Sequence, residues 1–200
     1  MWIYFVRHGE TTHNVERVVQ GHLPGELTQR GRSQARCLAK HLKGVAFDSV
    51  YCSISKRACD TLVEFLPFTT IKPIYSPLLR EKGYGEWEGV HKDIYYEMLC
   101  AQGLSKVDYR GSAGESYADL KGRAESFLSE LMHQTTEKRV LVVTHAGFIR
   151  MALASLTGGD IAEWVDRPLH YASITKVEID KNFSISQLMI DSNDYLTELI

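Results

Sequence analysis

Two histidines in this chain each follow an apolar run of the kind that forms a buried strand. Residues 2–6 are apolar and aromatic and lead into Arg7-His8-Gly9, whereas residues 140–143 lead into Thr144-His145-Ala146-Gly147. In an open α/β sheet, ligands bind outside the carboxyl ends of the strands. Two strands that each end in histidine would therefore bring both imidazoles to one crevice, and we place the candidate chemistry there.

Two arginines would add positive charge to that crevice. Arg7 is adjacent to His8, and Arg57 lies in the first turn of a predicted helix, where backbone N–H groups also favour an anion. Forked guanidinium groups suit phosphate particularly well. Arg7, Arg57, His8 and His145 together predict a cationic, donor-rich cup. The alternative for any arginine is a surface salt bridge, which we expect for Arg30, Arg32, Arg36 and Arg139.

A histidine at a strand end has several interpretations: a metal ligand, a nucleophile, a phosphate contact or a buried structural histidine. A metal hydrolase would need a carboxylate cluster or histidine pairs at ligand spacing, and the sequence has no HxH or HExxH. It also lacks the GxxxxGK[ST] run of a P-loop and the GxSxG nucleophile elbow. The residues therefore favour an anion-binding site without a metal ion.

The composition is ordinary for a soluble globular protein. The chain has 200 residues, 44% hydrophobic and 24% charged, with a net charge of -2, which fits one domain and gives no attraction to nucleic acid or membrane surfaces. No apolar run approaches the ~18 residues of a membrane span, and no basic leader precedes the first strand. Cys37, Cys52, Cys59 and Cys100 form no CxxC pair and indicate reduced thiols, so we expect a cytoplasmic protein.

Strand-like and helix-like patterns alternate along the chain. The expected strands are residues 2–6, 49–53, 71–75, 140–143, 173–179 and 183–190, the last two joined by a turn at Asp180-Lys181-Asn182. The expected helices are 28–43, 55–66 (ended by Pro67), one around 94–99, one that starts at Ser116 with a capping box to Asp119, and 148–156. Residues 12–25, 77–89 and 103–114 are expected to be loops. This alternation predicts a layered α/β/α fold with a mostly parallel, mixed central sheet.

Four motifs in order resemble the histidine phosphatase superfamily, also called the phosphoglycerate mutase-like family. They are Arg7-His8-Gly9-Glu10-Thr11, Ser53-x-x-x-Arg57-Ala58-x-x-Thr61, Leu79-Arg80-Glu81 through Gly85-Glu86-Trp87-Glu88-Gly89, and Thr144-His145-Ala146-Gly147. The resemblance runs from residue 3 to about residue 177. It implies a phosphoglycerate mutase-like fold and a phosphoric monoester hydrolase that needs no cofactor.

The resemblance also implies a covalent mechanism. A neutral His8 would attack phosphorus and form a phosphohistidine, while Arg7, Arg57 and His145 hold the phosphoryl oxygens. Glu81 would protonate the leaving oxygen and then activate water. That role needs a carboxyl that keeps a proton near neutral pH, and we expect a loop closed over the site by Tyr84 and Trp87 to favour this by excluding water.

Further positions match those through which the family contacts its substrate. The resemblance implies substrate-binding roles for Asn14, Gln20, Gly21, Thr28, Ala146, Glu115 and Ser116. The chain departs from the family at His13, where an aromatic residue is common, and at Tyr171, which replaces an asparagine. We expect neither departure to touch the catalytic residues.

The expected substrate is a small phosphorylated metabolite. The family's mutases carry a large insert where this chain has only a short cap, at about 82–114, which favours hydrolysis within a single domain, 1–200. The expected substrates are sugar or glycolytic phosphates such as fructose-2,6-bisphosphate. The alternatives are an α-ribazole phosphatase of cobalamin synthesis, a phosphoglycerate mutase, and an inactive phosphate-binding scaffold. A bisphosphate would need a second cationic contact, for which the candidates are Lys82, Lys92, Lys106 and Arg110. The sequence leaves the oligomeric state open.

Overall fold

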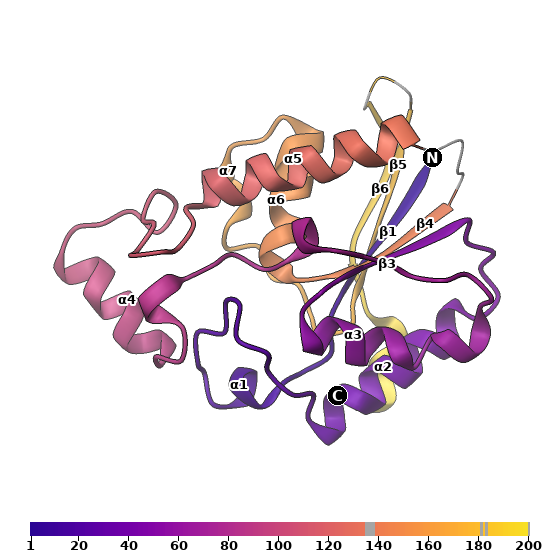
Figure 1. Cartoon of the computed structure of the whole chain (residues 1–200), viewed down its shortest axis with the longest axis horizontal. Helices are drawn as coiled ribbons and strands as arrows, with labels where there is room; N and C mark the ends of the chain where they lie inside the picture. Colours follow the sequence, from indigo (N-terminus) through magenta and orange to yellow (C-terminus); the bar gives the residue numbers. More distant parts are fainter. Residues whose placement is uncertain (135–138, 181, 183, 200) are drawn as a thin grey trace.

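A computed structural model describes residues 1–134, 139–180, 182 and 184–199 of the chain. Within these residues a six-stranded sheet has the order β3-β2-β4-β1-β5-β6 (Figure 1). The strands are β1 (Trp2–Arg7), β2 (Ser49–Ser53), β3 (Ile74–Ser76), β4 (Arg139–Thr144), β5 (Ile174–Ile179) and β6 (Ile185–Ser192). Strands β3, β2, β4 and β1 pair in parallel, whereas β5 is antiparallel to both β1 and β6. The mostly parallel, mixed sheet predicted from the sequence is confirmed.

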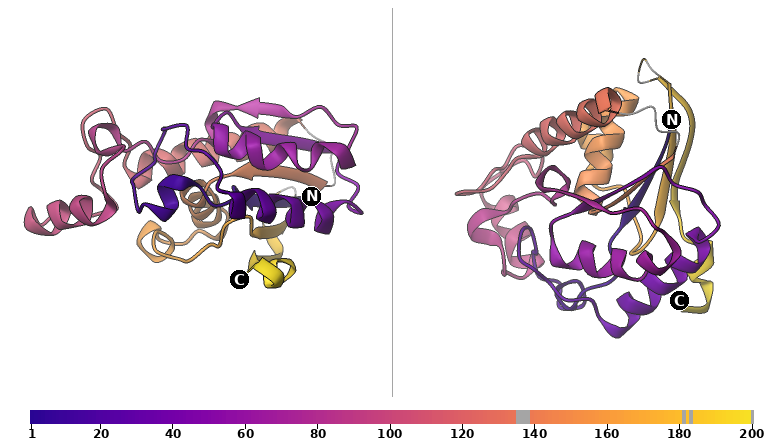
Figure 2. Two further views of the ribbon diagram at one scale, coloured as in Figure 1. Left: turned by 90° about the horizontal axis from the view of Figure 1, so that it is seen from below. Right: turned by 45° about the vertical axis from the view of Figure 1, so that its right-hand side comes forward.

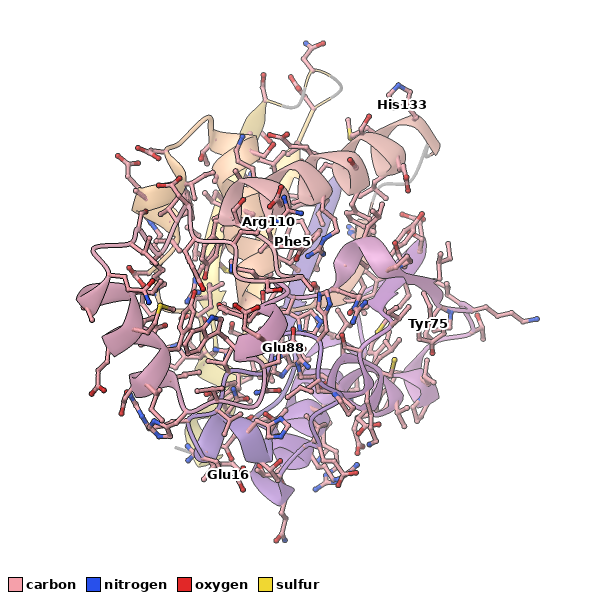
Figure 3. All side chains as sticks on the ribbon, turned by 60° about the vertical axis from the view of Figure 1, so that its left-hand side comes forward. Phe5, Glu16, Tyr75, Glu88, Arg110 and His133 are labelled. Atoms are coloured by element: carbon pink, nitrogen blue, oxygen red, sulfur yellow. The ribbon has the colours of Figure 1, made fainter. Side chains whose placement is uncertain are left out.

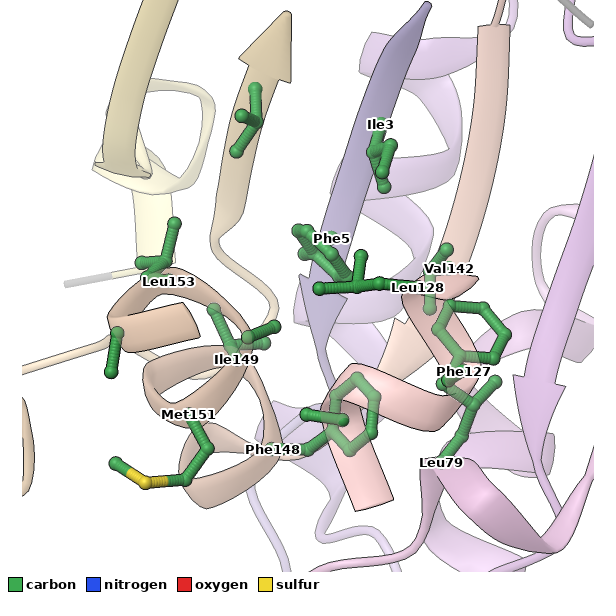
Figure 4. Close-up of a cluster of buried hydrophobic side chains, with 14 of the residues drawn as sticks. Ile3, Phe5, Leu79, Phe127, Leu128, Val142, Phe148, Ile149, Met151 and Leu153 are labelled. Atoms are coloured by element: carbon green, nitrogen blue, oxygen red, sulfur yellow. The ribbon is translucent and has the colours of Figure 1, made fainter. Parts of the chain in front are cut away.

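Helices cover both faces of the sheet (Figure 2). On one face lie α2 (Gln29–Leu42), α3 (Lys56–Val63) and η4 (Asp194–Leu199), and on the other lie α5 (Tyr117–Gln134), α6 (Ala146–Thr157) and α7 (Ile161–Trp164). Because side chains alternate across a strand, Ile3 and Phe5 join the core with α5 and α6 (Figure 4), whereas Tyr4 and Val6 join the core with α2 and α3. The result is the expected α/β/α layering.

The register of β1 and β4 sets the positions of the two histidines. The parallel pairing aligns Arg7 with Thr144, so His8 and His145 leave the sheet side by side. The His8 backbone N–H donates to the Thr144 carbonyl at 3.0 Å, which fixes this alignment beyond the last paired residues. The next pairing along the sheet aligns Cys52 of β2 with Val143 of β4, so Ser53 lies next to the same strand end.

The remaining elements build the connections around this strand edge. They are α1 (Thr12–Val15), η1 (Leu66–Phe68), η2 (Pro77–Leu79), η3 (Gly85–Trp87) and α4 (Lys92–Ala101). Helix α4 and the loop after it stand apart from the sheet in Figures 1 and 2, in the segment expected to form a cap. None of the helices in the described part of the chain combines the length and apolar character needed to cross a bilayer.

Several predicted boundaries were wrong for identifiable reasons. The helix predicted over 55–66 ends at Val63, and Pro67 lies inside the separate turn η1, because proline is tolerated in the first turn of a helix. The strand predicted at 71–75 is only Ile74–Ser76, because Pro73 has no N–H to donate and the Ile71 N–H is bonded to Thr69. The predicted loop 12–25 begins with α1, which a capping box between Thr11 and Asn14 starts. In the predicted hairpin, Lys181 and Phe183 lie outside the described residues.

The loop after β1 is packed directly against the start of α2 through two glycines. A Cβ on Gly31 would lie 2.0 Å from the Glu10 carbonyl oxygen, and a Cβ on Gly9 would lie 2.5 Å from the Gly31 carbonyl oxygen. Real Cβ atoms do not approach backbone this closely, so any side chain would push the loop away from the helix. This backbone contact therefore holds the loop that carries His8.

We predict opposite effects of alanine at two helical glycines. Gly31→Ala should lower the free energy of unfolding by about 1–3 kcal/mol through overpacking. Gly122→Ala, on α5, should raise it by up to about 1 kcal/mol, because a Cβ there meets no atom within 4 Å and alanine favours helix. Urea denaturation of both variants measures this difference, and a Gly31→Ala variant as stable as Gly122→Ala would contradict the packing argument.

Candidate active site

A cavity of about 400 Å³ lies at the carboxyl ends of β1 and β4. Arg7 and His8 at the end of β1, Arg57 from α3, and Glu81 from the loop after η2 all line it. His145 is 0% exposed and lies beside His8, with the two ring centroids 5.2 Å apart. The structure therefore brings together all five residues that the sequence singled out for chemistry.

The hydrogen bonds of His8 determine its tautomer. Its Nδ1 is 2.7 Å from the Gly9 carbonyl oxygen, and its Nε2 is 3.2 Å from the Arg57 Nε. Because a carbonyl oxygen only accepts and a guanidinium only donates, the proton is on Nδ1 and the lone pair is on Nε2. Burial, reinforced by the positive charges of Arg57 and Arg7, lowers the pKa of His8 well below its ordinary value. His8 is therefore a neutral imidazole near neutral pH, with a nucleophilic Nε2.

Arg57 is held by backbone carbonyls around His8. Its Nη1 donates to the Leu23 carbonyl at 2.7 Å and its Nη2 donates to the Gly21 carbonyl at 2.8 Å. Burial lowers the pKa of Arg57 to about 10, so the group keeps its charge at neutral pH. These bonds tie the loop before α2 to the first turn of α3.

Arg7, at the end of β1, stacks on an aromatic ring. Its Nη1 donates to the Leu169 carbonyl, and its guanidinium carbon is 4.0 Å from the centre of the Tyr171 ring. The expectation that Tyr171 does not touch the catalytic residues was therefore wrong. A tyrosine face attracts a guanidinium, so Tyr171 orients Arg7 in a way that the asparagine common in the family would not.

Two buried nitrogen atoms of this cluster have no hydrogen-bond partner within the described residues. They are Nε of Arg7 and Nδ1 of His145. His145 is bound through Nε2 to the Ser53 hydroxyl at 2.9 Å, and burial, together with the charge of Arg57, lowers its pKa well below the ordinary value. The Ser53 hydroxyl has one hydrogen, and when it donates this to His145 rather than to the Ser55 hydroxyl 3.2 Å away, His145 Nδ1 carries a hydrogen. Unpaired buried donors are costly, so Arg7 Nε, and His145 Nδ1 in that tautomer, fit a ligand that supplies oxygen acceptors.

Glu81 is held by backbone N–H groups from two segments. Its Oε1 accepts from the Lys82 N–H at 2.9 Å, and its Oε2 accepts from the Gly147 N–H at 3.1 Å. A Cβ at Gly147 would lie 2.1 Å from Glu81 Oε1, so only glycine lets the carboxylate reach this place. Tyr84 lines the cavity beside it, as expected, but Trp87 does not, because it packs on Tyr95 and donates to the Tyr109 hydroxyl.

The residues predicted to bind substrate fall into two groups. Asn14, Gln20, Gly21 and Ala146 line the cavity, whereas Thr28, Glu115 and Ser116 do not. Thr28 caps α2 by accepting from the Gly31 N–H and donates to Glu10. Ser116 forms the predicted capping box with Asp119. Glu115 binds Arg123 and the Gly83 N–H.

The cavity also has an outer wall, which comprises Lys92, Lys106, Arg150 and the tyrosines Tyr84, Tyr95 and Tyr96. The sequence predicted this wall only in part. Two of the four candidate cations, Lys92 and Lys106, line it, and Lys106 pairs with Asp166. Lys82 is instead buried against the Tyr84 ring, where burial lowers its pKa to about 8. Arg110, labelled in Figure 3, donates to the Gly114 carbonyl.

Further cavity residues were given no binding role from the sequence. They include Arg150 and the tyrosines Tyr95, Tyr96, Tyr117 and Tyr171. Arg150 follows Ala146 by four residues on α6, a spacing that puts both on one helix face, so this residue could have been found. Tyr95 and Tyr96 are neighbours on α4, whereas Tyr117 starts α5 and Tyr171 precedes β5, and no sequence spacing links these three segments.

Comparison with known proteins gives the family. A family model described as the histidine phosphatase superfamily (branch 1) matches residues 3–191. The chain belongs to the histidine phosphatase superfamily. This confirms the resemblance seen in the motifs and the enzyme class that it implied, a phosphoric monoester hydrolase.

Three relatives illustrate the similarity. The adenosylcobalamin/alpha-ribazole phosphatase of Escherichia coli K12 is 33% identical over 79% of this chain and 80% of its own length. The fructose-2,6-bisphosphatase TIGAR B of Danio rerio is 35% identical over 66% of this chain and 54% of its own. The crystal structure of the alpha-ribazole phosphatase from Shigella flexneri superposes with a TM-score of 0.85 at 27% identity, covering 96% of each chain.

We predict that His8 keeps its Nδ1–H tautomer at pH values well below the ordinary histidine pKa of 6.5. Its lowered pKa means that the neutral form persists as the pH falls through 6.5, where a histidine free in water gains a proton. NMR of the imidazole nitrogens across that pH range measures this, with N-acetylhistidine as the reference compound. A His8 ring that titrates together with the reference compound would contradict the neutral assignment.

Proposed function

We propose that the chain is a metal-independent phosphatase that hydrolyses small phosphomonoesters through a phosphohistidine on Nε2 of His8. The observation that carries this proposal is the neutral His8, whose Nε2 lone pair lies at a cavity beside two charged guanidiniums. A neutral imidazole is a nucleophile, and the guanidiniums attract and orient a phosphate. We further propose that the chain works as a single domain, and the free thiols fit a reducing compartment such as the cytoplasm.

In the first step, the His8 Nε2 lone pair leaves the hydrogen bond from Arg57 Nε and forms a bond to phosphorus, while the bond from phosphorus to the ester oxygen breaks. Glu81 donates its proton to that leaving oxygen and becomes a carboxylate. The Nδ1–H of His8, bound to the Gly9 carbonyl, stabilises the charge that the ring acquires. Arg7, Arg57 and His145 would hold the three other phosphoryl oxygens, with the unpaired donors of Arg7 and His145 as their contacts.

In the second step, water attacks the phosphohistidine. The Glu81 carboxylate accepts a proton from the water as its oxygen bonds to phosphorus, and the nitrogen–phosphorus bond breaks. Inorganic phosphate leaves, His8 returns to its neutral tautomer and Glu81 regains its proton. One residue serves as acid in the first step and base in the second because the leaving oxygen and the water occupy the same side of phosphorus.

Net hydrolysis is favoured over phosphoryl transfer by the short cap. The cap consists of α4 and its flanking loops, from which Lys92, Tyr95, Tyr96 and Lys106 line the cavity. A cap of this length favours access of water to the phosphohistidine after the first product leaves. Relatives that match the chain, including the enzymes from Escherichia coli and Danio rerio, are called phosphatases, whereas one from Arabidopsis thaliana, 34% identical over 74% of this chain, is called phosphoglycerate mutase-like protein 4.

Two substrate classes fit the outer wall. Lys92 and Arg150 line the cavity without carboxylate partners in the described residues, which favours a sugar or glycolytic phosphate with a second anionic group, such as fructose-2,6-bisphosphate. The tyrosine rings of Tyr84, Tyr95 and Tyr96 favour the second candidate, α-ribazole phosphate, because its flat base would pack on them. One named relative supports each class.

A substrate panel tests the proposal. The wild type and His8→Ala would be assayed, with metals chelated, against fructose-2,6-bisphosphate, 2- and 3-phosphoglycerate, 2,3-bisphosphoglycerate and α-ribazole phosphate. We expect phosphate release from at least one compound, lost by at least about 10³-fold in His8→Ala, because removing a nucleophile removes the covalent route. Phosphoglycerate interconversion without phosphate release would establish a mutase. Binding of phosphate without turnover would establish a scaffold and overturn the proposal.

We predict that Lys92→Met discriminates between substrates. For a bisphosphate, kcat/KM should fall about tenfold, the loss expected for a charged hydrogen bond, whereas for p-nitrophenyl phosphate it should change by less than about twofold. Lys106→Met is the matched control, because Lys106 is already paired with Asp166. Equal losses on both substrates would show that Lys92 does not contact a second anionic group.

A further inference from the structure

An arginine of α5 binds several carbonyls of the loop that carries Glu81. The Nη1 of Arg123 donates to the Leu78 carbonyl at 2.7 Å and to the Arg80 carbonyl at 2.6 Å. Its Nη2 donates to the Glu81 carbonyl at 3.0 Å. Residues 80–84 form no helix or strand, so the Arg80 and Glu81 carbonyls lack the partners that regular structure provides. Arg123 is a partner of both, beside His22, whose Nε2 is 2.9 Å from the Glu81 carbonyl oxygen, and it connects the loop to an 18-residue helix.

Glu115 completes this arrangement from the other edge of the guanidinium. Its carboxylate accepts from Arg123 Nε at 3.0 Å and from Nη2 at 2.8 Å, in a bidentate ion pair. The same carboxylate accepts from the Gly83 N–H at 2.7 Å, and the Glu115 N–H donates to the Gly83 carbonyl at 2.8 Å. The five N–H groups of Arg123 thus have five acceptors, and the loop is held on both sides of Glu81.

We infer that Arg123 and Glu115 are positioning residues that hold the Glu81 carboxyl at the leaving oxygen of the substrate. This inference rests on the proposed role of Glu81 as general acid. Arg123 fixes the Glu81 main chain, and the Lys82 and Gly147 N–H groups then fix the carboxyl. Displacement of a positioned acid by about 1 Å can cost about 10² in rate, so loss of this support should reach the chemistry.

Lysine cannot replace Arg123 in this role. An ammonium group keeps the charge but has three donors around one point, whereas the loop and Glu115 present acceptors along a planar fork. Arg123→Lys therefore keeps the ion pair with Glu115 possible while it loosens the loop. Glu115→Gln tests the opposite edge, since it removes the charge that orients the guanidinium.

The leaving group of the substrate separates positioning from general destabilisation. The phenolate of 2,4-dinitrophenyl phosphate leaves without a proton, whereas the alkoxide of an alkyl phosphate needs one from Glu81. We would measure kcat/KM, which reports the first phosphoryl transfer, for both compounds with the wild type, Arg123→Lys and Glu115→Gln. Leu42→Val, in the core on the opposite face of the sheet, serves as a stability control. Hydrogen exchange of the amides at 80–83 would be followed in each variant.

We expect Arg123→Lys and Glu115→Gln to lower kcat/KM for the alkyl phosphate by about 10–100-fold and for the dinitrophenyl ester by less than about threefold, with faster exchange at 80–83. Leu42→Val should leave kcat/KM unchanged for both esters. Equal losses on both esters, or unchanged exchange at 80–83, would overturn the positioning role. A wild type that hydrolyses neither ester, or a His8→Ala variant as active as the wild type, would instead overturn the proposed function and remove the basis of this inference.

Discussion

The in-register parallel pairing of β1 with β4 is the constraint on which the rest of the site depends. It aligns Arg7 with Thr144, so the next residue of each strand is a histidine and both leave the sheet at the same edge. A shift of one residue would turn each apolar side chain of β1 to the opposite face of the sheet. There it would meet the other core cluster, whose side chains pack around different partners, so the two cores enforce this register. The hydrophobic layers thus determine the distance between His8 and His145, and the pairing of β4 with β2 adds Ser53 to the same edge.

The site concentrates positive charge in a place where water is scarce. Arg57 is 1% exposed, and its hydrogen bonds, like that of Arg7, go to backbone carbonyls and His8. Buried charges without opposite partners are unfavourable, so the folded protein stores an electrostatic cost that a phosphate dianion would relieve. Burial, reinforced by the same positive charges, lowers the pKa of His8 and keeps it neutral, so one buried cationic site serves both phosphate affinity and nucleophilicity.

The sequence predicted the parts of the molecule that local chemistry determines. Continuous apolar runs located the strands that carry His8 and His145, and capping residues such as Thr28 and Ser116 located helix starts. It assigned Thr28, Glu115 and Ser116 to substrate contact because they lie in motifs, yet the structure places them in capping and loop support. The sequence could not predict contacts between distant segments. Arg123 binds the carbonyl of Glu81, 42 residues earlier in the chain. The Tyr171 ring packs on Arg7 from a segment that shows no helix or strand pattern.

The central claim is that Nε2 of a neutral His8 becomes phosphorylated, and the most direct measurement is to trap the phosphoenzyme. Wild type mixed with a radiolabelled phosphomonoester in a chelating buffer would be quenched with alkali within one turnover and digested for mass spectrometry. The account predicts an acid-labile, alkali-stable label on Nε2 of His8, because Nδ1 holds the proton that is bound to Gly9. A label on Nδ1 of His8 or on His145, or turnover without any label, would contradict it.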